Sequence, residues 1–240
     1  LGGARPKVNV EGEGHLWIAK FTSERDAKPI ERAEVATLKL AAMCGLRAAE
    51  ARLELAASDH PVALIRRFDR RGATRIPYIS ARTALDWQSE DSGFYTDIAD
   101  LIRQISSNPF EDLHELWRRI VFTVLVSNTD DHLKNHGFIY SGSDRWRLSP
   151  AFDINPSPAR HRILETGIMR GGSFDASLDI ALEACVFFEL TPQEAERSAK
   201  TMAETLQKLW KQALRNEGAS PGDVGVYAGA FENAEADKAL

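Results

Sequence analysis

The sequence has little that marks secreted, membrane-spanning or zinc-binding proteins. Its 240 residues include only two cysteines, Cys44 and Cys185, in apolar surroundings. We expect buried free thiols in a reducing compartment rather than a disulfide. No cysteine and histidine spacing is typical of a zinc site. No apolar run reaches the roughly 20 residues of a membrane span, and no signal-peptide pattern is present. The sequence therefore predicts a cytoplasmic protein that makes no membrane contact.

An excess of positive charge is also absent. The formal net charge is -5 and the pI is about 5.7, whereas proteins that bind nucleic acid non-specifically are usually basic. Arginines do gather in the sequence at residues 66–75, and Arg118 and Arg119 are adjacent. Such clusters are more often solvated surface than binding sites. We expect DNA contact to be indirect at most, or limited to this arginine patch.

The bulk composition predicts a globular protein with a core of its own. Apolar residues make up 43% and charged residues 27% of the chain, which fits one or two domains without internal repeats. The chain begins at Leu1 rather than at a methionine, inside a glycine-rich phrase. We expect a fragment or a disordered start.

Hydrophobic periodicity and turn residues predict a small α+β lobe over residues 1–70. Glycines form the first turn, and Gly45 stands where a helix would end. The predicted elements are strands over 8–10 and 16–21, a helix over 31–44, and strands over 52–56 and 62–68.

The rest of the chain is predicted to be a mostly helical lobe over residues 71–218 with a weakly patterned tail over 219–240. The apolar face of the helix at 111–126 is broad enough to predict burial. Thr191 to Glu194 is a capping box that begins a long helix. The predicted elements are helices over 97–104 and 111–126 and a hairpin formed by 137–140 and 146–148. The part after the hairpin is predicted to be helical, with one long helix over 192–215.

A cluster of acidic, amide and basic residues follows the predicted helix at 111–126. Asp130 and Asn135 are five residues apart, with Lys134 between them, just before a short hairpin. The exit of a short hairpin returns beside its entry, so Asp153 should lie near them. Metal-dependent phosphoryl transfer needs a base, a positively charged side chain for the phosphate, and two oxygen ligands for magnesium. A single aspartate more often caps a turn. Four groups that suit the same chemistry, placed around one hairpin, favour a phosphoryl-transfer site.

Two further features lie upstream, and their order along the chain is that of a kinase-like fold. Lys20 lies near the end of a predicted strand and Glu34 on the following helix. Such a pair can position the lysine on nucleotide phosphates. The glycine-rich phrase before the first strand could bring backbone N–H groups close to phosphates. Either feature alone is common in unrelated proteins.

Four segments resemble motifs of the HipA-like serine/threonine kinases, the toxins of bacterial toxin–antitoxin pairs. Residues 129–135 resemble the T-D-x-H-x-K-N catalytic loop, and residues 148–154 resemble the L-[ST]-P-x-[YF]-D-[IV] metal motif. Residues 67–70 are similar to the R-F-D-R hinge motif, and residues 2–7 to the glycine-rich start. The resemblance covers residues 2–215. It implies a protein-kinase-like, two-lobed α+β fold with a small β-rich N-lobe and a mostly helical C-lobe.

The resemblance also implies a role for each site residue. Asp130 would be the catalytic base, and Asn135 and Asp153 would hold magnesium. Asp131, in contrast, is expected to be a loop residue whose loss is tolerated. The residues implied to bind ATP are Gly2, Gly3, Ala4, Arg5, Pro6, Lys7, Lys20, Glu34, Arg66, Arg67, Phe68, His132, Leu133, Lys134, Asn135, Phe152 and Asp153.

The function implied by the resemblance is an ATP- and Mg²⁺-dependent serine/threonine protein kinase. Its substrate class would be an aminoacyl-tRNA synthetase, whose modification arrests translation, and its partner a HipB-like DNA-binding antitoxin. Two alternatives stay open: a small-molecule kinase, and a catalytically silent module that binds the antitoxin. A metal-dependent phosphodiesterase using His132 is disfavoured, because a two-metal site needs further His or Asp ligands.

Overall fold

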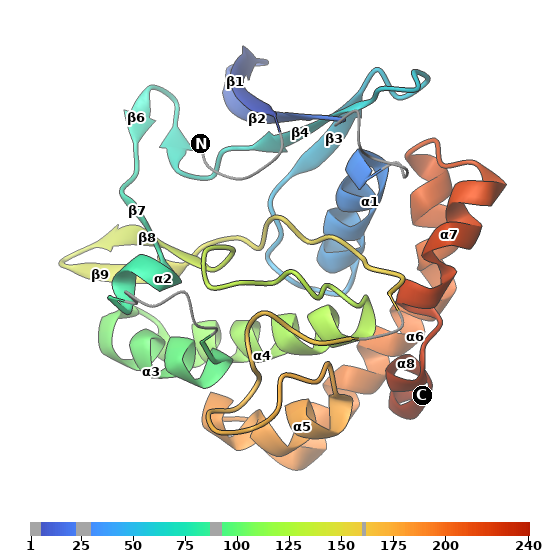
Figure 1. The fold of residues 1–240 in the computed structure, drawn as a ribbon. Helices are drawn as coiled ribbons and strands as arrows, with labels where there is room; N and C mark the ends of the chain where they lie inside the picture. The colour runs from blue at the N-terminus through green and yellow to red at the C-terminus, as the bar shows by residue number, and fades with distance from the viewer. Residues whose placement is uncertain (1–5, 23–29, 87–92, 160–161) are drawn as a thin grey trace.

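The structure, a computed structural model, describes residues 6–22, 30–86, 93–159 and 162–240. A small part built around one sheet lies above a larger, mostly helical part (Figure 1). This arrangement confirms the predicted β-rich lobe and the helical lobe that follows it. Among the described residues, no helix is both long enough and apolar enough to cross a membrane.

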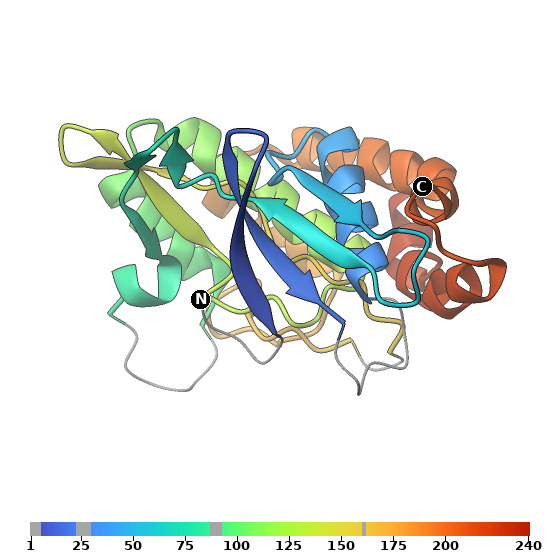
Figure 2. The ribbon, with the colours of Figure 1, turned by 90° about the horizontal axis from the view of Figure 1, so that it is seen from above.

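The N-lobe consists of a four-stranded antiparallel sheet and one helix. The strand order is β1-β2-β4-β3, and α1 packs against both β3 and β4. The view from above shows α1 between this sheet and the helices of the other lobe (Figure 2). The bounds are β1 (Lys7–Gly12), β2 (His15–Phe21), α1 (Ile30–Met43), β3 (Ala51–Glu54) and β4 (Val62–Arg66).

The alternation of side chains along β2 decides which residue faces α1. Trp17 and Ala19 are buried with Leu64 in a small cluster on one face of the sheet. Lys20, the next residue, therefore points to the opposite face. Its cross-strand partner Ala63 belongs to the main core together with the apolar residues of α1. Strand periodicity thus directs the lysine toward the helix that carries Glu34.

The C-lobe contains most of the helices, the two-stranded sheet β5-β6 and the three-stranded sheet β7-β8-β9. The bounds are β5 (Arg70–Arg71), β6 (Thr74–Arg75), β7 (Tyr78–Ser80), α2 (Ala81–Ala84), α3 (Tyr95–Ile105), α4 (Pro109–Leu125), β8 (Gly137–Gly142), β9 (Arg145–Leu148), α5 (Leu178–Glu183), the 3₁₀ helix η1 (Ala184–Phe188), α6 (Pro192–Asn216), α7 (Pro221–Phe231) and α8 (Ala234–Ala239).

Helix α4 is the centre of the C-lobe and matches its prediction closely. It begins at Pro109, where the Asn108 side chain accepts a hydrogen bond from Glu111 N at 3.4 Å. Capping by Asn and proline in the first turn both favour a helix start. The residues predicted to form its apolar face are all buried: Leu113, Leu116, Trp117, Ile120, Val124 and Leu125.

The predicted hairpin of β8 and β9 is confirmed, and the structure adds β7 at its edge. β7 lies beside Gly137, where an added Cβ atom would be 2.2 Å from the ring of Tyr78. Only glycine therefore allows this close approach. The strand is three residues long and lies within a loop-rich stretch, which is why no strand was predicted there.

Two expectations for the end of the chain are wrong. The part of the chain after the hairpin was expected to be helical, yet the described residues between β9 and α5 contain no helix. The tail after Glu217 was expected to be weakly patterned, yet it forms α7 and α8. The long helix α6 is confirmed, with its capping box at Thr191 and Glu194. Both cysteines are free, as predicted.

Candidate active site

The site is centred on the ammonium group of Lys20, which lies between two carboxylates. Its Nζ is 2.5 Å from Glu34 Oε1 and 2.6 Å from Asp153 Oδ1. Lys20 is 8% exposed and Glu34 is 3% exposed. The contact joins β2, α1 and the segment that follows β9, so residues 133 positions apart in sequence meet here.

The charges at this centre stabilise one another. Burial alone would lower the pKa of Lys20, but Glu34 and Asp153 raise it above its ordinary value. Burial alone would raise the pKa of Asp153, but Lys20 lowers it, with a smaller contribution from Lys7. Lys20 and Asp153 therefore both favour their charged forms near neutral pH. Burial raises the pKa of Glu34 above its ordinary value, although Lys20 opposes this rise. Lys7, predicted to cover phosphates, lies close enough to Asp153 to act on it.

Asp153 adopts a backbone conformation that is uncommon for a residue with a side chain. Its φ angle is +58°, in the left-handed region. Asn155 donates a hydrogen bond from Nδ2 to Asp153 Oδ1 at 3.3 Å, and Asn155 N donates to Asn128 Oδ1 at 3.1 Å. Such conformations persist where the surroundings fix them, often at functional sites. Asn128 thus links the loop after α4 to the segment of Asp153.

The loop at 130–135 alternates between outward and inward side chains. Asp130 and Lys134 are exposed, and neither side chain has a hydrogen bond or ion pair with any residue that the structure describes. Asn135 is buried, and its Nδ2 donates to Asp130 O at 3.2 Å. This bond leaves the Asn135 amide oxygen available as a metal ligand. His132 is half-buried, and Leu133 is buried, with Gly93 packed against it.

Asp131 lies in the loop, as expected, but its burial and its hydrogen bonds argue against the expectation that its loss is tolerated. It is 5% exposed and accepts hydrogen bonds from Tyr95 Oη, from Thr123 Oγ1 at 3.3 Å and from His136 Nε2 at 3.1 Å. Burial alone would raise the pKa of Asp131, but His136 and these hydrogen bonds hold it below its ordinary value. Asp131 therefore attaches the loop to α3 and α4.

The residues predicted to form the hinge lie at the end of β4, close to the segment of Asp153. The ring of Phe68 is 5.6 Å from that of Phe152 and 5.9 Å from that of Tyr78, measured between centroids. The backbone N–H and C=O of Phe68 have no hydrogen-bond partner within the described ranges. The structure therefore brings Phe68 and Phe152 together and leaves the Phe68 backbone available to a ligand.

The remaining predicted residues that the structure describes contact groups other than Lys20, Glu34 and Asp153. Arg66 forms an ion pair with Glu50 at 2.7 Å, and Arg67 forms one with Asp69 at 2.6 Å. Pro6 lies beside β2, since Phe21 N donates to Pro6 O at 3.1 Å. Gly2, Gly3, Ala4 and Arg5 lie outside the described residues.

A small cavity is lined by residues of the loop and by the two neighbours of Asp153 in sequence. Its lining includes side chains from α4, from the loop and from the segment of Asp153, and the predicted residues Asn135 and Phe152 are among them. The lining residues are Leu46, Arg119, Phe122, Thr123, Asn128, Asp131, Asn135, His136, Ala151, Phe152 and Ile154.

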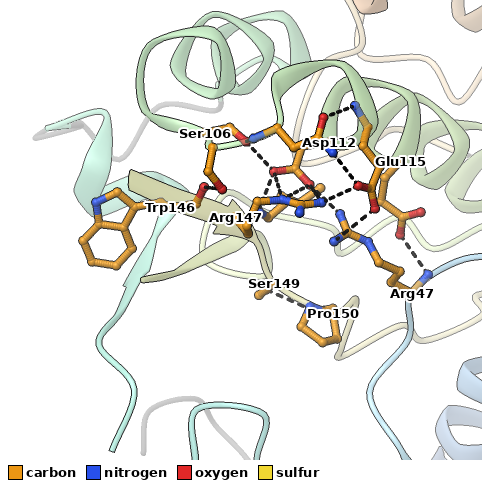
Figure 3. A network of polar contacts seen from close by, with 12 residues as sticks. Arg47, Ser106, Asp112, Glu115, Trp146, Arg147, Ser149 and Pro150 are labelled. Carbon is orange, nitrogen blue, oxygen red and sulfur yellow. Dashed lines mark hydrogen bonds and ion pairs between the residues drawn. The ribbon is translucent and has the colours of Figure 1, made fainter. Parts of the chain in front are cut away.

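A buried polar network fixes the strand that leads to Asp153 (Figure 3). Asp112 on α4 is fully buried, and its carboxylate accepts hydrogen bonds from three parts of the chain outside the helix. The donors are Arg47 Nη2 at 2.6 Å, Ser106 Oγ at 2.7 Å, Leu148 N at 3.0 Å, and Arg147 Nε and Nη2 at 3.0 and 3.1 Å. Together these bonds attach β9 to α4.

Glu115 and Arg119, one and two turns further along α4, extend the same network. Glu115 Oε1 accepts from Arg47 N at 3.0 Å and from Arg119 Nε at 2.9 Å. Arg119 Nη2 donates to Ser149 O at 2.7 Å, at the start of the segment that ends in Asp153. Sequence reasoning did not identify this network. The acidic residues inside the apolar pattern of α4 were the available signal, because buried charges require partners.

The Asp112 network should make the stability of the protein sensitive to acid. Burial alone would raise the pKa of Asp112, but Arg147 and the other donors lower it. A lowered pKa stabilises the fold above the unfolded-state value of about 3.9, and this stabilisation is lost as the pH falls through the folded-state value. We expect Asp112→Asn to lower the free energy of unfolding more at about pH 7 than at about pH 3. Urea denaturation at both pH values measures the difference.

Asp59→Asn is the matched control for that measurement. Asp59 is exposed and makes no hydrogen bond or ion pair with the residues that the structure describes. Its replacement should change the free energy of unfolding little at either pH. A destabilisation by Asp112→Asn of equal size at both pH values would contradict the expected linkage.

Comparisons with known proteins agree with this geometry. The family model of the HipA-like C-terminal domain matches residues 1–212. A curated relative from Sinorhizobium fredii, named "Putative kinase Y4dM", is 29% identical over 231 residues, which are 87% of this chain and 55% of that protein. The chain thus spans about half the length of this relative.

Two solved structures resemble the fold. One is a chain from the toxin–antitoxin complex of HipA, HipB and operator DNA of Shewanella oneidensis MR-1, with a TM-score of 0.71 and 17% identity; the match covers 99% of this chain and 64% of that chain. The other is the proinflammatory kinase CtkA of Helicobacter pylori, with a TM-score of 0.63 and 14% identity, over 100% and 93% of the two chains. These similarities confirm the predicted protein-kinase-like, two-lobed fold.

The match over residues 1–212 extends from the N-lobe sheet through the loop of Asp130 to α6. It includes every residue whose position at the site has been described above. The chain therefore belongs to the family of HipA-like C-terminal domains, as the motifs in its sequence predict.

Proposed function

We propose that this chain is the catalytic part of an ATP- and Mg²⁺-dependent kinase that phosphorylates a serine or threonine of a protein. The observation that carries the proposal is the placement of Lys20 Nζ between Glu34 and Asp153, at 2.5 and 2.6 Å. A lysine so held can bind nucleotide phosphates beside a carboxylate that binds their metal ion. The proposed division is an N-lobe over residues 1–70, a C-lobe over 71–218 and a C-terminal part over 219–240.

The donor set at the site suits magnesium. Mg²⁺ prefers oxygen ligands and is usually bound by one or two protein groups together with phosphate oxygens and water. Asp153 offers a carboxylate, and Asn135 offers the amide oxygen that its bond to Asp130 O leaves available. When bound there, magnesium would neutralise charge on the phosphates. Among the described residues, no group of three or more His, Cys, Asp or Glu side chains is placed to hold a metal ion.

The proposed transfer assigns a step to each residue. The carboxylate of Asp130 accepts the proton of the substrate hydroxyl as its oxygen forms a bond with the γ-phosphorus. The bond from that phosphorus to the bridging oxygen breaks, and ADP leaves with the electron pair. Lys20 neutralises charge on the phosphates, and the exposed Lys134 is available for the same task, with His132 beside it. Asp130 suits this role because its carboxylate is exposed and unpaired within the described part of the chain.

The proposed nucleotide pocket lies between the lobes. The adenine ring would pack on Phe68, with the Phe68 backbone groups bonding to its edge and Phe152 lying below. Arg66, Arg67 and Leu133 would contribute backbone or packing contacts. Residues 2–7 would cover the phosphates, of which Lys7 is close enough to influence Asp153.

The wider function proposed is that of a toxin with an antitoxin partner. The solved relative from Shewanella oneidensis comes from a complex of HipA, HipB and operator DNA. We extend this to a HipB-like DNA-binding partner here, and to an aminoacyl-tRNA synthetase as the substrate class. DNA contact by this chain would be indirect or through the arginine patch. Arg71 and Arg75 there are exposed, and neither has an ion pair with the residues that the structure describes.

Expression of the parent protein and of Asp153→Ala, followed by phosphoproteomics, tests the proposal. We expect new phosphoserine or phosphothreonine sites with the parent protein and their loss with Asp153→Ala, because the variant lacks both the metal ligand and the partner of Lys20. Asp59→Ala, which removes an exposed and unpaired carboxylate, should leave the phosphosites unchanged. If no new phosphosite depends on Asp153, the protein-kinase proposal fails. ATP turnover without protein phosphosites would favour a small-molecule kinase, and no turnover a silent module.

A further inference from the structure

The last turn of α4 leads directly into the loop of Asp130 and has unusual partners. The helix ends in a Schellman motif, in which Asn128 N donates to Thr123 O at 3.0 Å and Ser127 N donates to Val124 O at 3.3 Å. Glycine usually occupies the left-handed position of this motif, but here Ser127 does so, with φ +56°. A serine in that conformation needs support from its surroundings.

That support comes from the C-terminal segment, defined as residues 217–240. Ser127 Oγ donates to Ala230 O at 3.0 Å. Asn233 Nδ2 donates to Ala230 O at 2.9 Å and to Leu125 O at 3.1 Å, so it satisfies a carbonyl that the helix end leaves free. Arg162 donates to Asn233 Oδ1 at 3.0 Å and also to Val124 O. Among the described residues, Asn233 is thus the residue of the segment whose side chain hydrogen-bonds to α4.

The beginning of the same segment contacts α1, the helix that carries Glu34. Glu217 Oε1 is 2.5 Å from Lys39 Nζ, and Glu217 O accepts from Arg32 Nη1 at 2.7 Å. Gly218 has φ +79°, and an added Cβ there would be 2.5 Å from Arg32 Nη1. The chain therefore turns closely around the Arg32 guanidinium. In consequence one short segment contacts both α1 and the end of α4.

The segment itself is firmly attached to the C-lobe. The ring of Phe231 stacks on that of Trp210 in α6 at 4.9 Å between centroids. Glu235 accepts from Leu178 N at 2.6 Å, and Lys238 forms an ion pair with Asp179 at 2.6 Å, both at the start of α5. In Figure 1, α7 and α8 lie along α6 at one side of the molecule. All of residues 217–240 lie beyond the residues matched by the family model.

We propose that the C-terminal segment is a positioning element for the site, with Asn233 as its positioning residue for the catalytic loop. Through Leu125 O and Ser127 it fixes the direction in which the chain leaves α4, and so the places of Asp130 and Asn135. Through Glu217 it holds α1, and so the Glu34 that pairs with Lys20. The inference rests on the proposed function, since it concerns the activity of the same site.

Asn233→Asp in the full chain separates this role from a merely structural one. Asparagine Oδ1 caps α8 by accepting from Glu235 N and Ala236 N, both at 3.1 Å, and aspartate can do the same. Aspartate cannot donate to Leu125 O or Ala230 O. We therefore expect the thermal midpoint to stay close to that of the parent protein. Amide hydrogen exchange at residues 125–135 should become about 10-fold faster, because two backbone carbonyls lose their donor. The kcat of phosphotransfer should fall about 10-fold, with the KM for ATP little changed.

Glu232→Ala is the matched control in the same segment. Glu232 is exposed and pairs with Lys211 on the surface at 2.7 Å, so its loss should leave both exchange and kcat unchanged. If Asn233→Asp matches the parent protein in exchange and in kcat, Asn233 is only a cap and the inference is overturned. Hydrogen exchange can be measured without any kinase activity. If the parent protein has no such activity, the proposed function is refuted, and the exchange rates still decide the role of Asn233.

Discussion

Replacement of Asp130 by asparagine should lower the rate of phosphotransfer by about 10²- to 10⁴-fold, the contribution typical of a general base. The amide has nearly the same shape but cannot accept the proton of the substrate hydroxyl. Because the Asp130 side chain is exposed and has no partner within the described ranges, its replacement should alter neither folding nor nucleotide affinity. Single-turnover kinetics with ATP and the substrate protein measure the rate.

Two companion measurements make the result specific for the proton-accepting role. The dissociation constant for ATP and the thermal midpoint should both equal those of the parent protein. A variant that retains most of the transfer rate would show that Asp130 is not the base. A variant with weakened ATP binding would instead point to a role in nucleotide contact.

Replacement of the neighbouring Asp131 by alanine should destabilise the fold by about 3–5 kcal/mol, the usual result of removing one partner from a buried charged network. The change leaves Tyr95 Oη, Thr123 Oγ1 and His136 Nε2 without their acceptor in a buried region. Unsatisfied buried groups lose their hydrogen bonds to water without replacement. Urea denaturation monitored by tryptophan fluorescence gives the free energy of unfolding.

Asp130→Ala is the control for the Asp131 prediction, because the two positions are adjacent and have opposite exposure. It should change the free energy of unfolding by less than about 0.5 kcal/mol, as surface substitutions usually do. Equal effects of the two alanine variants would contradict the structural difference between an exposed Asp130 and an Asp131 that anchors the loop to the core.

The pair of adjacent aspartates also shows where the sequence stops being informative. Spacing from Asn135 and the resemblance to a known catalytic loop single out Asp130. They say nothing about Asp131, whose three partners come from positions 95, 123 and 136. Tyr95 and Thr123 have no local signal, because only the packing of α3 against α4 brings them to the loop. Burial of Asp131 could therefore not be predicted.

The fold was predictable where side-chain periodicity and capping residues agree. The apolar face of α4 and the capping box of α6 are such cases. Helix α7 was missed because Gly225 and Gly229 lie in its interior, and each glycine disfavours a helix by about 1 kcal/mol relative to alanine. A signal was present nevertheless: Ser220, Pro221 and Asp223 form a capping box with proline at the first helical position.

The sequence showed only that Lys20 and Glu34 can form an ion pair, because a strand with a lysine is followed by a helix with a glutamate. The direction of Lys20 follows from the alternation along β2, which the sequence shows. Its contact with Asp153 depends on the path of residues 149–152, which the buried Arg119 fixes through Ser149 O. That path is irregular and was expected to belong to a helical part. The tertiary hydrogen bonds, rather than local propensity, decide it.

The shared lysine has a consequence for the order and strength of ligand binding. The Lys20 ammonium bonds to Asp153 Oδ1, an oxygen that a divalent cation would also use. In the proposed kinase, phosphate oxygens that attract Lys20 would free this carboxylate for the cation. A cation at Asp153 would in turn release Lys20 toward the phosphates. Each ligand would then raise the affinity for the other by the same factor, as thermodynamic linkage requires.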